Sequence, residues 1–262
     1  MTGIGAYDIP TRDKIPVLQK LFSSQKEGFA LDVGSGIGFT AAAVLGRQPL
    51  VCLDLHAANL MYFLDRVAPR SGEGKAYGLR ADVNRLPFRE GVFRKILCSE
   101  VLEHLEDDDS AVRELARVLA PGGKLVITVP YTGLGFTSFL EMMRIKTVHD
   151  RPGPERHVRR GYDEKSMGTL LSRHGLKIES HTYYLRFFSR LATDLVSLIH
   201  LAYQKVRHGR HSWQWSDVAA SENEGVLKLY KLVFPALWVF TRLDRCLAGC
   251  RGFGLVVCAR KR

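Results

Sequence analysis

Three glycines spaced two residues apart, Gly34, Gly36 and Gly38, form the first group with recognisable chemistry. They follow a short apolar run and precede a segment of helix composition. Glycine permits positive φ angles and lets a ligand approach the backbone closely. Asp54 ends the next apolar run, about 20 residues after the glycines, where a carboxylate can accept hydrogen bonds from both ribose hydroxyls of a nucleoside. The pattern predicts a strand, a tight loop and a helix that bind a nucleoside.

The spacing of the glycines separates two kinds of nucleoside ligand. A dinucleotide-binding loop has the pattern G-x-G-x-x-G, and its third glycine would fall at Phe39. The pattern here is G-x-G-x-G, preceded by Asp32, so it departs from the dinucleotide-binding loop. A glycine turn that binds no ligand is the alternative.

A second group, Glu100, Glu103 and His104, has the spacing E-x-x-E-H. If the segment is helical, the three side chains share a face through the i, i+3, i+4 relation. Two carboxylates and an imidazole could then hold a divalent cation that acidifies a hydroxyl group. In the alternative interpretation the cluster anchors a loop and caps a helix. His104, with Glu100, would then position an acceptor or remove its proton.

A third group lies in the polar loop 149–162, which combines prolines and glycines with two histidines, four arginines and a tyrosine. In one interpretation the loop covers an acceptor, its arginines bind an anionic group, and His157 or Tyr162 transfers a proton. In the other it is a solvated basic loop that leads into a helix capped by Asp163.

The elements that must position these groups alternate between strands and helices. This alternation predicts a parallel sheet covered on both faces, with ligands outside the carboxyl ends of the strands. Helical periodicity predicts helices at 10–27, 57–67, 110–119 and 166–173. Apolar runs predict strands at 29–33, 49–55, 76–82, 93–99, 124–130, 176–184 and 254–260.

Five segments in this order resemble the class I S-adenosylmethionine (SAM) methyltransferases, over about residues 28–185. The resemblance implies a doubly wound, Rossmann-like α/β sheet, mainly parallel with an antiparallel last strand, and an enzyme that uses SAM as co-substrate. The E-x-x-E-H cluster also looks like the divalent-metal motif of the quinone-pathway O-methyltransferases. The five segments are 31–38, Asp54, 81–88, 100–105 and 117–125.

The resemblance also implies roles for single residues. Gly34 and Gly36 would pack against the methionine portion of SAM, Asp82 would accept from the adenine amino group, and Ser99 would line the sulfonium end. A turn-capping carboxylate is the alternative for Asp82. The implied SAM-contacting residues are Asp32, Gly34, Ser35, Gly36, Gly38, Asp54, Leu55, Asp82, Val83 and Ser99. The candidate catalytic residues are His104, Glu100, His157 and Tyr162, and the candidate metal ligands are Glu100, Glu103 and His104.

A helical insertion distinguishes this chain from the class I methyltransferases that it resembles. We expect residues 1–185 to form the SAM-binding core, 186–250 the insertion and 251–262 the last core strand. Two apolar stretches of the insertion flank a patch of basic residues and tryptophans at 205–215. This combination suits an anionic membrane surface, where tryptophan lies at headgroup level. In the alternative, the insertion only covers the acceptor pocket as a lid.

Composition narrows the function further. Lys and Arg exceed Asp and Glu by 11, and such a basic balance suits an anionic membrane surface, nucleic acid or an acidic substrate. The five cysteines predict reduced thiols in a cytoplasmic protein, and no signal-peptide pattern precedes the first helix. We therefore expect a cytoplasmic methyltransferase of an apolar or lipid-linked small molecule, peripheral on the inner membrane face. The alternatives are a soluble metabolite or sugar as acceptor and, outside small-molecule chemistry, a nucleic-acid-binding methyltransferase or a non-catalytic scaffold. No RNA-binding motif is visible, so no nucleic acid is expected, and nothing in the sequence indicates an oligomeric state.

Overall fold

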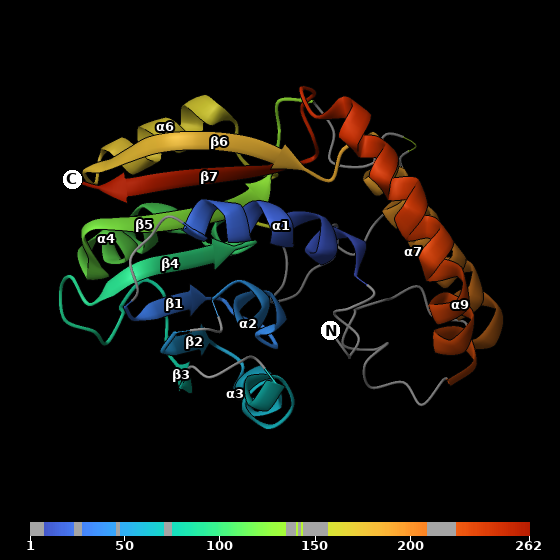
Figure 1. The fold of residues 1–262 in the computed structure, drawn as a ribbon, viewed down its shortest axis with the longest axis horizontal. Coiled ribbons are helices and arrows are strands. Elements are labelled where there is room, and N and C mark those ends of the chain that lie inside the picture. The colour runs from blue at the N-terminus through green and yellow to red at the C-terminus, as the bar shows by residue number, and fades with distance from the viewer. Residues whose placement is uncertain are drawn as a thin grey trace. The chain divides into compact units, whose positions relative to one another are not determined.

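The protein forms two compact units in the computed structural model. The sheet unit comprises residues 15–133, 157–182 and 254–262, and the helical unit comprises residues 1–14, 134–156 and 183–253. Figure 1 labels the elements of both. For residues 70, 200–208 and 224–231 the structure describes the backbone alone. The residues described are 8–23, 28–45, 48–70, 75–134, 140, 143, 157–208 and 224–262.

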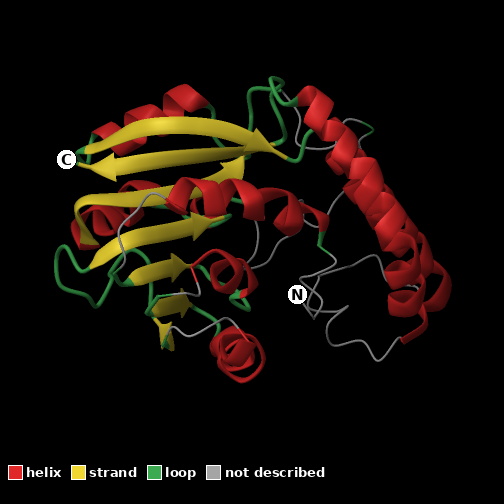
Figure 2. Ribbon diagram, viewed as in Figure 1, coloured by secondary structure: helices red, strands yellow, loops and turns green. Residues whose placement is uncertain are grey.

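The sheet unit is built on a seven-stranded sheet with the order β3-β2-β1-β4-β5-β7-β6, whose strands are labelled in Figure 1 and yellow in Figure 2. The pairs from β3 across to β5 are parallel, and β7 runs antiparallel to β5. This is the doubly wound, mainly parallel α/β sheet predicted from the sequence, with its antiparallel last strand. The strands are β1 (Ala30–Val33), β2 (Leu50–Asp54), β3 (Ala76–Arg80), β4 (Phe93–Ser99), β5 (Leu119–Pro130), β6 (Leu176–Tyr184) and β7 (Gly254–Lys261).

Burial of apolar residues and capping side chains explain where the elements of the sheet unit form. Every residue of β1 and β2 is buried, as expected for parallel strands covered on both sides. Asp107 caps α4 by accepting from Ser110 N, and Asp163 and Ser166 form a capping box at the start of α6. α4 and α6 lie on the same side of the sheet (Figure 1). The helical elements are α1 (Ile9–Ser23), of which the residues from Ile15 on belong to this unit, α2 (Phe39–Leu45), α3 (Ala57–Tyr62), the π-turn η2 (Phe63–Val67), the 3-10 turns η3 (Ala68–Arg70) and η4 (Leu102–His104), α4 (Asp108–Val118) and α6 (Glu164–Ser172).

Among the described residues, two predicted boundaries differ from the structure by more than two residues. The fifth strand begins at Leu119 rather than Lys124, because the chain pairs with Phe93 before it passes through Pro121-Gly122-Gly123. Gly122 has a φ of 70°, which glycine adopts without steric cost and which lets the strand continue through the turn-like sequence. The helix predicted at 57–67 is α-helical only to Tyr62 and continues as η2 and η3.

The helical unit contains α7 (Phe187–His208), α9 (Glu224–Thr241) and the 3-10 turn η6 (Arg242–Leu247). The two apolar stretches of the predicted insertion are thus helices. Asp244, in the turn η6 that follows α9, links this segment to the first turn of α7. Its carboxylate accepts hydrogen bonds there from Phe188 N and Ser189 N at 2.8 and 2.9 Å. None of the described helices is long and apolar enough to cross a membrane. The patch at 205–215 lies outside the described side chains.

Candidate active site

The three glycines of the first loop differ in what surrounds them. All have positive φ, 64° at Gly34, 51° at Gly36 and 71° at Gly38. A Cβ added at Gly34 would lie 2.3 Å from Val101 Cγ2, and one at Gly38 would lie 2.2 Å from the Phe63 ring. A Cβ at Gly36 would meet no atom within 4 Å. Packing therefore requires Gly34 and Gly38, whereas Gly36 borders open space that a ligand could fill.

Asp54 faces this loop from the end of β2 and is 7% exposed. Its carboxylate accepts from Gly36 N and His56 N, each at 2.8 Å, and from Asn59 Nδ2 at 3.3 Å. A carboxylate offers about four acceptor positions, so Asp54 retains capacity for one ribose hydroxyl. The second ribose hydroxyl could bind by replacing the longer hydrogen bond from Asn59 Nδ2. The geometry suits the predicted ribose contact.

The other predicted SAM-contacting residues lie at the same sheet edge, because they end or follow the parallel strands β1 to β4. Asp32 is buried within β1 and Leu55 is exposed after β2. Asp82 Oδ1 accepts from Asn84 N at 2.9 Å and Val83 beside it is buried, so Asp82 caps its turn as the alternative predicted. Its exposed position leaves room for a ligand contact as well.

Glu100 does not share a helical face with Glu103 and His104. Its φ is 57°, and the 3-10 turn η4 begins only at Leu102, so the i, i+3, i+4 premise of the predicted metal site is wrong. Glu100 Oε1 instead accepts from Thr128 Oγ1 at 2.6 Å, and Thr128 Oγ1 lies 2.9 Å from Ser99 Oγ. Thr128 is fully buried in β5 and was missed by the sequence reasoning, because a threonine inside an apolar strand carries no motif.

Glu103 and His104 are joined by His157 from the polar loop. The three offer ligand atoms within 4.8 Å of one another, the only such group among the residues that the structure describes, and Glu100 is not part of it. Glu103 is fully buried, and its carboxylate lies 3.9 Å from His104 Nε2. The rings of His104 and His157 meet edge to face with centroids 4.7 Å apart. The structure thus brings together two residues of one predicted group and one of another.

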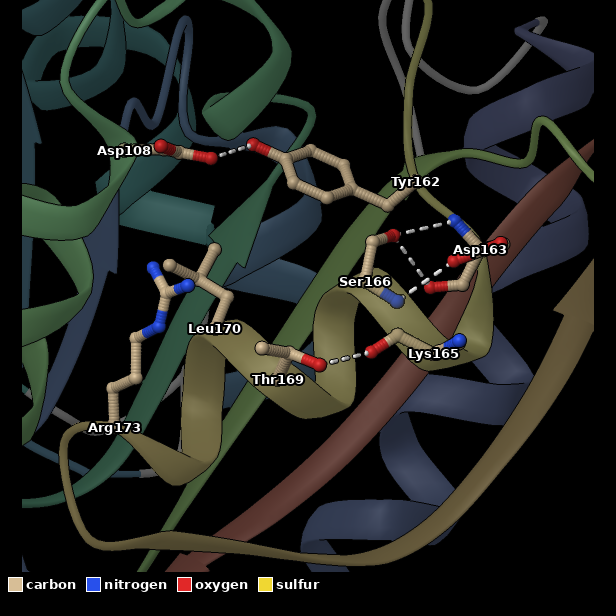
Figure 3. Close-up of a pocket in the computed structure, with 8 residues that line it drawn as sticks. All are labelled: Asp108, Tyr162, Asp163, Lys165, Ser166, Thr169, Leu170 and Arg173. Carbon is tan, nitrogen blue, oxygen red and sulfur yellow. Dashed lines mark hydrogen bonds between the residues drawn. The ribbon is translucent and has the colours of Figure 1, made fainter.

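Arg159 and Tyr162 hold the loop that carries His157. Arg159 pairs with Asp108 and donates to Leu105 O at 2.8 Å. The Tyr162 hydroxyl donates to Asp108 Oδ2 at 2.6 Å, as Figure 3 shows. Burial, and then the Asp108 carboxylate, raise the pKa of Tyr162, so the phenol stays protonated at neutral pH. These contacts favour a positioning role for Tyr162 rather than the predicted proton transfer, and Arg159 anchors the loop. The part of the loop from 149 to 156 lies outside the described residues.

A pocket of about 430 Å³ opens beside this anchor, between the start of α4 and α6 (Figure 3). None of the predicted SAM-contacting residues lines it, and Tyr162 is the single candidate catalytic residue that does. The pocket is therefore distinct from the glycine loop. Its lining residues are Asp108, Tyr162, Asp163, Lys165, Ser166, Thr169, Leu170 and Arg173.

Comparison with known proteins agrees with this architecture. Residues 31–127 match the family described as "Methyltransferase domain". Norajmaline N-methyltransferase of Rauvolfia serpentina is 32% identical over 111 residues, which cover 40% of this chain and 36% of the relative. The ubiquinone/menaquinone biosynthesis C-methyltransferase UbiE of Vibrio campbellii is 33% identical over 101 residues, 37% of this chain and 39% of the relative. The matches thus span little more than a third of the length of these relatives.

Among solved structures, the cyclase SpnF superposes with a TM-score of 0.59 at 17% identity, covering 96% of this chain and 80% of that one. Geranyl diphosphate C-methyltransferase from Streptomyces coelicolor superposes with a TM-score of 0.52 at 13% identity, covering 95% and 77%. At these identities the likeness shows the fold. The matched domain over residues 31–127 and the shared fold confirm the resemblance to class I SAM-dependent methyltransferases that the motifs predicted. The co-substrate of this class is SAM.

Proposed function

We propose that this chain transfers a methyl group from SAM to an apolar or lipid-linked small molecule at the cytoplasmic face of a membrane. The observation that carries the proposal is the Asp54 carboxylate, which is held against Gly36 N beside the open space over Gly36. The second candidate acceptor is a soluble metabolite or sugar. It would be methylated at the same site if the helical unit does not contact lipid.

The chain's own residues would orient the two substrates. When bound, SAM supplies an electrophilic methyl group on a sulfonium. Asp54 would hold the ribose hydroxyls, and Val83 would lie against the adenine ring. Ser99, which ends β4, would lie near the sulfonium end, and its contact with Thr128 holds its hydroxyl in place. His104 and His157 would position an acceptor oxygen, nitrogen or carbon for in-line attack on the methyl group.

The acceptor class is supported by exposed apolar side chains on the helical unit. On α9, Leu232 and Val239 are 79% and 69% exposed and recur at i and i+7, which places them on one helical face. Leu243, in the 3-10 turn η6 that follows α9, is 46% exposed. Arg242 and Arg245 beside them are also exposed. An apolar helical face flanked by arginines, in a chain with a net charge of +11, suits an anionic lipid surface. A relative named as a C-methyltransferase of ubiquinone/menaquinone biosynthesis agrees with an apolar acceptor.

The function is tested by incubating the purified chain with SAM carrying a radiolabelled methyl group and a total extract of cells. We expect label in the organic phase of a chloroform–methanol extraction. Label confined to the aqueous phase would favour the soluble-acceptor candidate. SAM affinity measured by calorimetry in the absence of any acceptor tests the co-substrate separately, and no measurable affinity would sink the proposal.

Asp54→Ala should lower SAM affinity by roughly tenfold to a hundredfold, because it removes hydrogen bonds to a poorly solvated carboxylate worth about 1–3 kcal/mol. Calorimetry of SAM binding measures the change. Asp109→Ala is the matched control, since this carboxylate lies on α4 and contacts His174 and Arg173 rather than the glycine loop. Equal affinity in Asp54→Ala and the wild type would remove Asp54 from the site.

The double variant Val239→Ser/Leu243→Ser should bind anionic vesicles about thirtyfold more weakly than the wild type. Each side chain contributes about 1 kcal/mol if roughly half of it inserts into the bilayer. Sedimentation with vesicles of phosphatidylglycerol and phosphatidylcholine measures the binding at low salt. Met61→Ser/Leu64→Ser is the matched control, because these exposed apolar residues belong to the sheet unit. A wild-type chain that stays in the supernatant would leave a soluble acceptor as the function.

A further inference from the structure

The cluster of Glu103, His104 and His157 combines ligand types that transition metals prefer. Glu103 and His104 come from η4, directly after the carboxyl end of β4, and His157 comes from a segment more than fifty residues later. Their ligand atoms lie within 4.8 Å of one another. Two imidazoles and one carboxylate suit Zn²⁺ and Fe²⁺ better than they suit Mg²⁺ or Ca²⁺, which prefer oxygen ligands.

Backbone contacts hold the two segments in register. Val158 N and Arg159 N both donate to Glu103 O, at 2.8 and 3.2 Å. The two residues after His157 are therefore both hydrogen-bonded to the backbone carbonyl of Glu103, whose side chain belongs to the cluster. The Arg159 guanidinium adds a bond to Leu105 O on the other side of His104. His157 thus reaches η4 by a fixed path rather than through a chance contact of a mobile side chain.

We propose that Glu103, His104 and His157 bind one divalent transition-metal ion at the acceptor side of the SAM site. Nitrogen and oxygen ligands lie about 2.0–2.2 Å from Zn²⁺, so ligand atoms around one ion are closer than 4.8 Å and must approach by roughly 1 Å. The two imidazoles are partly exposed and can turn to close this distance. The buried carboxylate of Glu103 provides the negative charge that offsets the cation.

The ion would have coordination positions left for an acceptor. Three protein ligands with an open fourth position are typical of catalytic rather than structural zinc sites. His104 has 27% of its side chain exposed, so the open side is accessible from solvent. A hydroxyl oxygen of the acceptor bound there would lose its proton to solvent more readily and be held as an oxyanion. This use of the ion rests on the proposed methyl transfer, whereas binding of the ion does not.

The test uses the full, untagged chain, stripped of metal by a chelator and titrated with Co²⁺ under visible absorption, followed by displacement with Zn²⁺. We expect one ion per chain, with absorption bands typical of cobalt bound by imidazole. His157→Gln and His104→Gln should each weaken binding by at least about a hundredfold, more than changes outside the coordination sphere cost. Glu103→Gln is informative only if its thermal unfolding matches that of the wild type.

Two matched controls separate this site from its alternatives. Glu100→Gln removes the carboxylate that the E-x-x-E-H spacing predicts as a ligand but the structure directs to Thr128, and it should keep wild-type metal affinity. His174→Gln removes another histidine that contacts a carboxylate, Asp109, at 3.1 Å, and it should also bind normally. Substoichiometric binding, or equal affinity in His157→Gln and the wild type, would overturn the proposal. Calorimetry of SAM binding to the metal-free chain keeps this outcome distinct from failure of the proposed function.

Discussion

Replacing Gly36 with valine should abolish SAM binding in a chain that still folds. The added side chain would project into the open space beside the Asp54 carboxylate, where no protein atom lies within 4 Å. It would therefore overlap the ligand rather than the protein. Overlap of this size costs about 3 kcal/mol, which lowers SAM affinity by roughly a hundredfold or more. Calorimetry with SAM and with S-adenosylhomocysteine measures the loss.

Gly175→Val is the matched control for this variant. Gly175 also has a positive φ, 71°, and a Cβ there would also meet nothing within 4 Å, but it lies in the turn between α6 and β6. Both substitutions place a branched side chain in the left-handed region and should lower the free energy of unfolding by a similar amount, about 1–3 kcal/mol. If Gly175→Val loses SAM affinity as well, backbone strain rather than ligand overlap explains the effect. If Gly36→Val binds SAM normally, the glycine loop is not the SAM site.

Arg159→Ala should lower the free energy of unfolding by about 2–3 kcal/mol, the range expected for hydrogen bonds to charged groups. The guanidinium pairs with Asp108 and donates to Leu105 O, and its removal leaves a carboxylate that is only 19% exposed. Chemical denaturation measures the change. Hydrogen exchange at residues 157–162 should rise, because the loop that carries His157 loses its anchor.

Arg173→Ala is the matched control, because it removes an arginine that pairs with Asp109, the residue after Asp108. Its side chain and that of Asp109 are 63% and 44% exposed, and their closest approach is 3.6 Å. An exposed pair of this kind contributes less than about 1 kcal/mol. Equal destabilisation by Arg159→Ala and Arg173→Ala would contradict the anchoring role of Arg159.

The fold by itself does not decide the chemistry. SpnF superposes on this chain over most of its length and is described as a cyclase, whereas other structural neighbours are described as methyltransferases. Function must therefore be argued from the site. Here the Asp54 carboxylate and the space over Gly36 support SAM binding, and the Glu103–His104–His157 cluster supports chemistry at an acceptor.

The order of the elements was readable from the sequence because it depends on local signals. Buried parallel strands appear as apolar runs, and a capping residue such as Asp163 marks a helix start within four residues of chain. The strand boundaries at Phe93–Ser99 and Leu176–Tyr184 were predicted correctly for this reason. The start of β5 was not, because its first residue is placed by pairing with Phe93 across the sheet.

The site required tertiary structure because its residues meet through space. The sequence alone determined that Asp54 would lie about 20 residues after a glycine loop at the end of a strand. The resemblance placed Gly34 and Gly36 together against the methionine portion of SAM. In the structure Val101 and Phe63, distant in sequence, pack against Gly34 and Gly38, and Gly36 alone of the three borders open space. Spacing grouped Glu100 with Glu103 and His104, because a helix was assumed there. In the structure the left-handed backbone at Glu100 rules out a shared helical face with Glu103 and His104. The hydrogen bonds from Val158 N and Arg159 N to Glu103 O instead bring His157 to the cluster.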